Sequence, residues 1–315
     1  MRKLVVSSSL LLIIIILISQ PIMANSLETE SSFGNRMKVF PKLGGLIADK
    51  PTDIQLNPAF WTQIDERELF TDFYLQSIPE GSSKLDFTSQ LGYRLNKKNV
   101  LGGKFAVNSD TGDYIFKVGD ALQINENLSL GGRTGVENIA EQLQVVLAAG
   151  ANYQVTDNFV LDGTVGLKND EEIKLFMRGK KQLNKTESLI GLINLAQEGF
   201  AYKRLAVAKN EQREDSLWVY GGEVVDRQAA TAVNLMWGSE LKFNQKLTGR
   251  AGGQYNLFYK SDESTEVKLP HIDLANVGVS YKIDESTTID LASTPVLQFG
   301  EKAKLILSFT LQQKF

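Results

Sequence analysis

The sequence predicts an all-β fold: an antiparallel transmembrane β-barrel of about 14 strands, preceded by a segment of different character. Three observations predict it. An apolar run follows two basic residues at the N-terminus, apolar and polar residues alternate along most of the chain, and a final alternating strand ends in Phe315. We assign residues 1–24 to a signal peptide, 25–65 to an N-terminal segment that precedes the barrel, and 66–315 to the barrel itself.

The composition excludes several classes of protein. The 315 residues include no Cys and one His, which removes zinc ribbons, iron–sulfur clusters, thiol nucleophiles and a lipoprotein anchor. The net charge of −3 and the pI near 5.5 provide no basic field for nucleic acid. The single histidine, His271, follows an acidic stretch that is typical of a loop. We therefore expect no catalytic residues, no metal site, no cofactor and no nucleic-acid partner.

The first residues have the form of a secretory signal. Arg2 and Lys3 precede an apolar run over Leu10–Ile18, and Ala24 is a small residue at the expected cleavage position. The alternative is a membrane anchor, but the run is shorter than the roughly 20 apolar residues that span a bilayer. Cleavage after Ala24 would release the chain from the inner membrane. Because no later segment could form a transmembrane helix, we expect strands to place it in the outer membrane of a Gram-negative-type bacterium.

Strands account for most of the remaining chain. Over residues 143–155 one face is apolar and the other is small or polar. Residues 91–103, 121–132 and 151–163 share one template: a strand, a short polar turn with Asn or Asp, a second strand and Gly. Counting the runs between turns gives fourteen to sixteen strands, and we take about 14 as the expectation. Residues 188–208 and 291–304 are the least regular.

Alternation alone does not say where the apolar face points. It could face lipid around a polar lumen, or it could form the core of a soluble β-sandwich or barrel. The last strand favours lipid, because it resembles the C-terminal assembly signal of outer-membrane barrels, with its apolar face formed by Leu307, Phe309, Leu311 and Phe315. Gln313 departs from that pattern, in which an apolar residue is usual. The resemblance implies outer-membrane lipid and the barrel-assembly machinery as partners.

The segment before the barrel carries an ordered set of small and turn-forming residues: Gly44, Gly45, Ala48, Asp49, Asn57, Pro58 and Ala59. This set resembles the N-terminal hatch of the outer-membrane long-chain fatty-acid transporter (FadL-like) superfamily, which includes secretion-shuttle relatives. The resemblance implies that residues 25–65 plug the barrel, and that a hydrophobic small-molecule ligand binds in the lumen and leaves sideways between strands. Phe60 and Trp61 depart from the family pattern, and the Asn-Pro-Ala tripeptide could instead be a turn that starts the first strand.

Candidate lumen residues stand out on the polar face of the predicted strands. Phe70, Tyr74 and Phe176 are aromatic where a lipid-facing position does not explain them, and Lys174, Arg178 and Lys180 form a row of cations. The aromatic residues could line a ligand path or pack the plug against the wall. Two other functions stay open: a general diffusion porin, whose charges set ion selectivity, and a noncatalytic structural or shuttle barrel that binds a partner protein.

Overall fold

The computed structural model describes residues 57–64, 67–77, 83–108, 111–139, 141–169, 172–196, 202–227, 230–261, 267–268, 271–296 and 304–315. The predicted signal peptide and most of the predicted N-terminal segment therefore lie outside the described residues. One short 3₁₀-helix, η2 (Pro58–Gln63), precedes the first strand.

Seventeen strands form one sheet. The first nine are β1 (Arg67–Ser77), β2 (Ser83–Arg94), β3 (Asn99–Asn108), β4 (Tyr114–Gln123), β5 (Leu128–Ile139), β6 (Gln142–Thr156), β7 (Phe159–Lys168), β8 (Glu172–Gln182) and β9 (Glu187–Ala196). The others are β10 (Tyr202–Gln212), β11 (Ser216–Arg227), β12 (Ala230–Lys242), β13 (Leu247–Ser261), β14 (Val267–Lys268), β15 (His271–Lys282), β16 (Thr287–Val296) and β17 (Lys304–Lys314).

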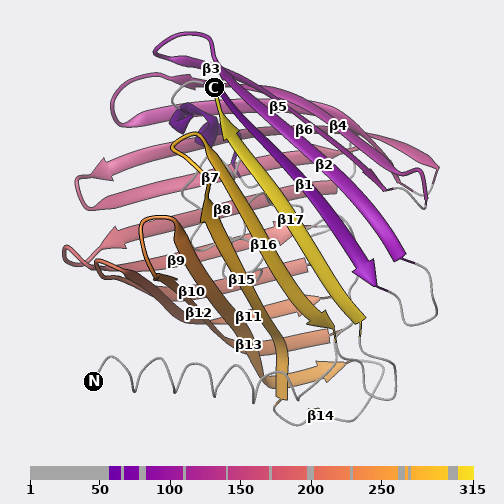
Figure 1. Ribbon diagram of the computed structural model, residues 1–315, viewed down its shortest axis with the longest axis vertical. Coiled ribbons are helices and arrows are strands. Elements are labelled where there is room, and N and C mark those ends of the chain that lie inside the picture. The colour runs from indigo at the N-terminus through magenta and orange to yellow at the C-terminus, as the bar shows by residue number, and fades with distance from the viewer. Residues whose placement is uncertain are drawn as a thin grey trace.

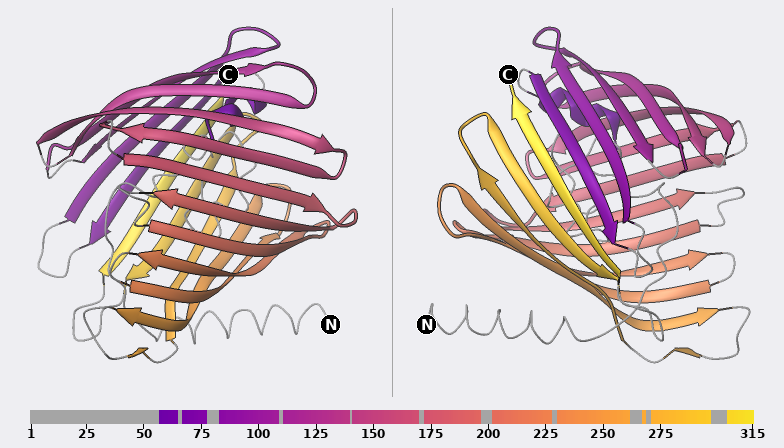
Figure 2. Two further views of the ribbon diagram at one scale, coloured as in Figure 1. Left: turned by 180° about the vertical axis from the view of Figure 1, so that it is seen from behind. Right: turned by 45° about the vertical axis from the view of Figure 1, so that its right-hand side comes forward.

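Sixteen of these strands close into an antiparallel barrel. Each pairs with the strands before and after it, and β1 pairs with β17 from Glu68–Lys314 to Ser77–Leu305 (Figure 1). The two-residue β14 pairs with β13 alone. The strands run obliquely around the wall (Figure 2), as closure of a sheet requires. The transmembrane-barrel architecture is thus the one predicted from the sequence.

The expected count of about 14 strands is wrong, because the described chain has sixteen in the barrel. Of the two least regular stretches, residues 188–208 contain most of β9 and the first part of β10. Residues 291–304 contain the end of β16 and the first residue of β17. On β9, Ile190 and Leu192 are buried while Leu189 and Ile193 are exposed. Both faces of this strand are apolar, so the sequence shows no clear two-residue period there.

The apolar face points outward. Leu143, Val145 and Leu147 on β6 are 62%, 52% and 47% exposed, whereas Gln90 and Thr310 are fully buried. Large apolar residues on the outside and polar residues within are the arrangement of a barrel in lipid rather than of a soluble one. Among the described residues, no helix is long and apolar enough to cross a bilayer.

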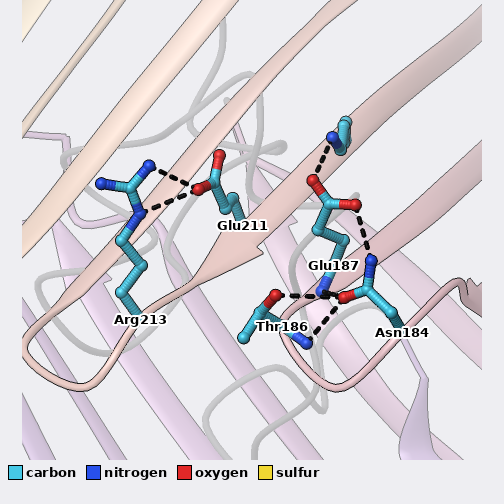
Figure 3. Close-up of polar contacts among 6 residues, drawn as sticks. Asn184, Thr186, Glu187, Glu211 and Arg213 are labelled. Atoms are coloured by element: carbon cyan, nitrogen blue, oxygen red, sulfur yellow. Dashed lines mark hydrogen bonds and ion pairs between the residues drawn. The ribbon is translucent and has the colours of Figure 1, made fainter.

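A tight turn of one type recurs at one end of the barrel. In the β2–β3, β4–β5, β8–β9, β12–β13 and β15–β16 connections, a side-chain oxygen accepts hydrogen bonds from the backbone N–H groups two and three residues later; the residues are Asn96, Asn125, Asn184, Asn244 and Asp284. Figure 3 shows one of these turns, where Asn184 also donates to Glu187 at 2.8 Å. Such Asx turns fix the backbone conformation of the connection between two strands.

The chain ends at this same end of the barrel, which we call the terminal end. The N–H of Phe315 donates to the carbonyl of Arg67 at 3.0 Å. The start of β1 and the residue that follows β17 therefore lie side by side at this end. Leu307 and Phe315 are exposed on the outside, and Phe309 and Leu311 are half-buried. Their role as an assembly signal stays a prediction.

Candidate functional site

The segment Asn57–Ile64 enters the lumen at the terminal end (Figures 1 and 2). The local sequence explains its conformation. Asn57 is extended at φ −145°, and its side-chain oxygen accepts from the N–H of Ala59 at 3.0 Å. Pro58 supplies the fixed φ that suits the first helical position. The N–H of Ile64 donates to the carbonyl of Trp61 at 3.0 Å and ends the helix.

Apolar side chains hold this segment against the wall. Phe60, Trp61 and Ile64 are at most 3% exposed and form one cluster with Val100 of β3 and Ala121 of β4. Burying a large apolar side chain contributes roughly 1.5–3 kcal/mol. These three residues therefore bind the segment to the wall independently of its polar contacts.

The wall is recessed where the segment lies. Glycines on five successive strands face it at the closest approaches: Gly92, Gly102, Gly119, Gly131 and Gly150. A Cβ atom on Gly131 would lie 2.5 Å from the backbone N of Ala59 and 2.5 Å from the backbone carbon of Pro58. Since neither backbone atom can yield as a flexible side chain would, this part of the wall admits glycine alone.

Polar contacts fix both ends of the segment. The Asn57 amide donates to the carbonyl of Ala151 on β6 at 2.8 Å. At the other end the Arg94 guanidinium of β2 donates to the carbonyls of Ile64 at 2.6 Å and Thr62 at 2.5 Å. Charge-assisted bonds of this kind are stronger than neutral ones. Asn57–Ile64 therefore spans the inside of β2–β6 as a fixed lining.

A buried ion pair lies beside the segment. Arg178 on β8 binds Asp162 on β7, with both Nε and Nη2 at 2.9 Å from one carboxylate oxygen. The same guanidinium lies over the ring of Phe60, 5.4 Å from its centroid. This arrangement joins the lining segment to the next part of the wall through a cation–π contact.

Part of the wall beyond the segment is apolar. Its inward-facing side chains on β8–β12, together with one from β16, form a single buried cluster that we call the apolar wall: Phe176, Ile190, Leu192, Ala206, Ala208, Leu217, Val219, Met236 and Ala292. Ile190, Ala206, Ala208 and Val219 are each 1% exposed.

Lumen charges near the apolar wall are paired with opposite charges on nearby strands. Arg204 binds Glu223 at 2.6 Å, and Asn234 donates to the other Glu223 oxygen at 2.8 Å. Arg250 lies between Glu240, at 2.7 Å, and Asp290, at 3.7 Å. Charges held in this way offset one another's desolvation.

The structure brings together part of the set predicted from the sequence. Asn57, Pro58 and Ala59 lie against β5 and β6, and Phe176 and Arg178 face the lumen nearby. Lys174 and Lys180 are half-buried on the same face of β8. Phe70 and Tyr74 lie on β1, opposite Gln312 and Ser308 of β17, but their side chains are outside the described set. Gly44, Gly45, Ala48 and Asp49 also lie outside the described residues.

Sequence reasoning missed two features, the glycine recess and the apolar wall. Gly102 and Gly131 were visible as the residue before the last glycine of their strand–turn–strand templates, where glycine suggests bending of the sheet. Their inward direction and their shared contact with Asn57–Ile64 could be recognised only from the register of the strands. The apolar wall gave no signal, because apolar residues are expected in every strand.

The closed sheet and its apolar exterior define a transmembrane β-barrel. No protein-family model and no curated protein matches the sequence. Among solved structures the chain is similar to a bacterial polysaccharide outer membrane secretin, with a TM-score of 0.61 and 8% identity over 80% of this chain and 99% of that one.

A hydrocarbon channel and a toluene transporter of the FadL family share the fold. CymD, a monoaromatic hydrocarbon channel, aligns with a TM-score of 0.55 and 13% identity over 91% of this chain and 98% of its own. The Ralstonia pickettii toluene transporter TbuX aligns with a TM-score of 0.52 and 12% identity over 92% and 100%. At these identities the likeness establishes the barrel fold, and the three neighbours are a secretin, a channel and a transporter rather than enzymes.

Proposed function

We propose that this protein is a transporter of the FadL-like superfamily that passes hydrophobic small molecules through a barrel plugged by residues 25–65. The apolar wall is the observation that carries the proposal. In an open, water-filled lumen its side chains would be costly, whereas each CH₂ group of a ligand buried against them contributes about 0.8 kcal/mol. CymD, a monoaromatic hydrocarbon channel, and TbuX, a toluene transporter, align over 91% and 92% of this chain.

The fixed lining Asn57–Ile64 supports the plug. It is held by Arg94 and Asn57 at its ends and by the recess in β2–β6 between them. Because the segment occupies the β2–β6 side of the lumen, a ligand path at this level runs along β8–β12, where the apolar wall lies. The plug and the ligand path are then adjacent, and the ring of Phe60 in the plug contacts the Arg178 guanidinium on β8.

A sideways exit fits the seam between β15 and β16. The two strands pair as far as Val277 and Ser293, although β15 begins at His271 and β16 continues to Val296. In this region β15 keeps its pairing with β13, and β16 keeps its pairing with β17. Pro295 has no N–H to extend the ladder. We assign the exit to this unpaired part of the seam.

Binding of a hydrophobic probe tests the proposal. We expect the purified barrel in an uncharged detergent to bind N-phenyl-1-naphthylamine with a saturable rise in fluorescence, and Leu192→Gln to weaken that binding about tenfold. Thr164→Gln, a lumen-facing change on β7 outside the apolar wall, serves as the matched control. Equal binding by both variants would remove the basis of the proposal.

Planar-bilayer conductance separates the alternatives. The intact protein should be silent, and a version lacking Asn25–Trp61 should conduct. A large steady current from the intact protein would favour the diffusion porin. A silent barrel that retains no hydrophobic probe would favour the structural or shuttle barrel.

Cross-linking tests the exit. The chain has no cysteine, so the pair Asn276→Cys with Thr294→Cys can be joined across the seam by a short bismaleimide. Joining should slow exchange of bound N-phenyl-1-naphthylamine into liposomes. The pair Val279→Cys with Leu291→Cys, at positions already opposite each other, is the control and should leave exchange unchanged. Unaltered exchange after complete linkage at 276 and 294 would place the exit elsewhere.

A further inference from the structure

The outer face of the barrel carries a row of large apolar side chains at the terminal end. In five of the connections there, the residue before the turn-forming Asn or Asp is exposed and apolar: Leu95, Ile124, Leu183, Phe243 and Ile283. The backbone N–H of each donates to the carbonyl four residues later. The β10–β11 connection differs, because the N–H of Arg213 donates to the carbonyl of Ser216, three residues later. A cation whose side chain is 65% exposed therefore interrupts the apolar row.

Further charged side chains lie beside Arg213 on the outside of the barrel. On β10, Leu205 and Val207 are exposed and Ala206 between them is buried, so the odd-numbered residues of this strand face outward. The pairing of β8, β9 and β10 extends this outer face to the neighbouring strands. We call the charged residues on it, or directly beyond its edge, the charged patch: Lys181, Glu187, Lys209, Glu211 and Arg213.

The charged patch presents both signs of charge to the outside (Figure 3). Glu187 and Glu211 are directly opposite each other, a position in which like charges are destabilising. Each has a cation: Lys209 binds Glu187, and Nε and Nη2 of Arg213 lie 2.8 and 2.6 Å from one oxygen of Glu211. These four side chains remain between 24% and 65% exposed. Such a surface is unfavourable against hydrocarbon and is readily solvated among polar headgroups.

Aromatic side chains mark the membrane boundary beside the charged patch. Trp218 and Tyr220 on β11 lie opposite Glu211 and Lys209, and Trp237 on β12 lies opposite Tyr220. Trp and Tyr concentrate where the hydrocarbon of a bilayer meets the headgroups. On this side of the barrel the boundary therefore lies at the level of Tyr220 rather than at the turn.

The opposite boundary is close as well. Asp226 on β11 pairs with Lys203 at 3.4 Å, and their side chains are 47% and 58% exposed. From Tyr220 to Asp226 the strand advances by only about 20 Å, which is about 16 Å in height at a tilt near 40°. On β6 the outward-facing apolar positions continue from Tyr153 back to Leu143, which is about 26 Å in height and matches the usual band of about 25 Å. The apolar band is thus about 10 Å shorter on β11 than on β6.

One partner fits both the charges and the short band. We propose that the charged patch is a docking surface for zwitterionic phospholipid headgroups, which hold the bilayer in a locally thin state over β10 and β11. The cations of the patch suit the phosphate of such a headgroup, and its carboxylates suit the ammonium. A short apolar band favours a thin bilayer, because each ångström of mismatch has an energetic cost. The surface lies outside the barrel, so the proposal goes beyond transport through the lumen and does not depend on it.

Spin labels measure the local thickness directly. The chain has no cysteine, so Val224→Cys and Ala149→Cys can each carry a single nitroxide. Both positions face outward, and they lie the same distance along the strand from Tyr220 and from Tyr153. In dioleoylphosphatidylcholine bilayers, the accessibility of the label to oxygen and to nickel EDDA should give a depth of about 10 Å at position 149 and only about 5 Å at position 224. Equal depths would overturn the proposal.

Two sets of variants test the role of the charged patch, with the label at Val207→Cys. The leucine variant combines Glu187→Leu, Lys209→Leu, Glu211→Leu and Arg213→Leu. It should extend the apolar band toward the turn and move the label from a depth of about 5 Å to about 10 Å. The matched control exchanges the charges within each pair, with Glu187→Lys, Lys209→Glu, Glu211→Arg and Arg213→Glu, and should keep the shallow depth. A label that stays shallow in the leucine variant would contradict the assigned role of the patch.

Lipid length provides a second measurement. The parent and the charge-exchanged control should resist urea better in dilauroyl than in dioleoylphosphatidylcholine bilayers, and the leucine variant should show the reverse order. The comparison of positions 224 and 149 uses the intact patch, so it does not depend on the folding of these variants. Spin–spin broadening at position 224, which a second copy on this face would cause, would overturn the proposal. N-phenyl-1-naphthylamine binding at the apolar wall should be the same throughout, so the two proposals can fail separately.

Discussion

Replacing Gly131 with alanine tests the contact between the lining segment and the wall. The new Cβ would lie 2.5 Å from two backbone atoms of Pro58 and Ala59, whereas ordinary contact begins at 3.4 Å. The segment must then move by about 0.9 Å (3.4 − 2.5). Overpacking of this kind costs about 2 kcal/mol, which shifts the balance between bound and released segment roughly 30-fold.

The neighbouring glycine provides the control. Gly132, the next residue, has no such contact. The atom nearest to a Cβ at this position would be Oδ1 of Asp120, at 3.6 Å. Both variants change one hydrogen to a methyl group on β5, but on opposite faces of the wall. We expect single-channel recordings to show frequent openings for Gly131→Ala and none beyond the parent level for Gly132→Ala. If Gly131→Ala is as silent as Gly132→Ala, the segment does not close the lumen at β5.

Three further predictions concern the lining segment, the buried ion pair and one turn. Asn57→Ala removes a helix cap and the bond to β6, so it should destabilise the bound segment by about 1–2 kcal/mol, measured as faster proteolysis within residues 25–65. Arg178→Ala leaves Asp162 buried without its cation and should cost about 3–5 kcal/mol in urea unfolding, and the added Asp162→Asn change should recover part of this; a further loss would contradict it. Hydrogen bonds from the turn that follows lower the pKa of Asp284 from its usual 3.8, so its stabilisation is complete above that pH and is lost as pH falls through the lowered value. Asp284→Asn should keep the turn, as asparagine does in the four equivalent connections, and remove this acid dependence; unchanged acid sensitivity would show that other carboxylates control it.

The structure brings part of the predicted set of residues together because part of that set is local in sequence. Asn57, Pro58 and Ala59 form a cap and a helix start from their own chemistry, and these can be recognised in any sequence. Arg178 and Phe176 stood out because Lys174, Arg178 and Lys180 form a row of cations on the polar face of β8, which the aromatic Phe176 interrupts. The partners of these residues were not found, since Asp162 and Phe60 reach Arg178 from positions distant in sequence.

The strand count shows a second limit. Where one face is apolar and the other polar, as on β6, alternation marks the strand clearly. On β9 the lumen face is itself apolar through Ile190 and Leu192, and the pattern disappears. The feature that weakened the strand prediction is thus the feature that supports a path for hydrophobic molecules.

The sequence by itself determined that this chain is all-β, that most strands have one apolar and one polar face, and that Asn- and Asp-based turns connect them. These properties depend on a two-residue period and on contacts within a few positions, which every sequence displays directly. Only the tertiary structure decided which lumen residues meet: Gly131 with Ala59, Arg178 with Phe60, and Gln90 with Lys104. Those pairs follow from strand register and from closure of β1 on β17, because a one-residue change of register would turn every lumen side chain toward lipid.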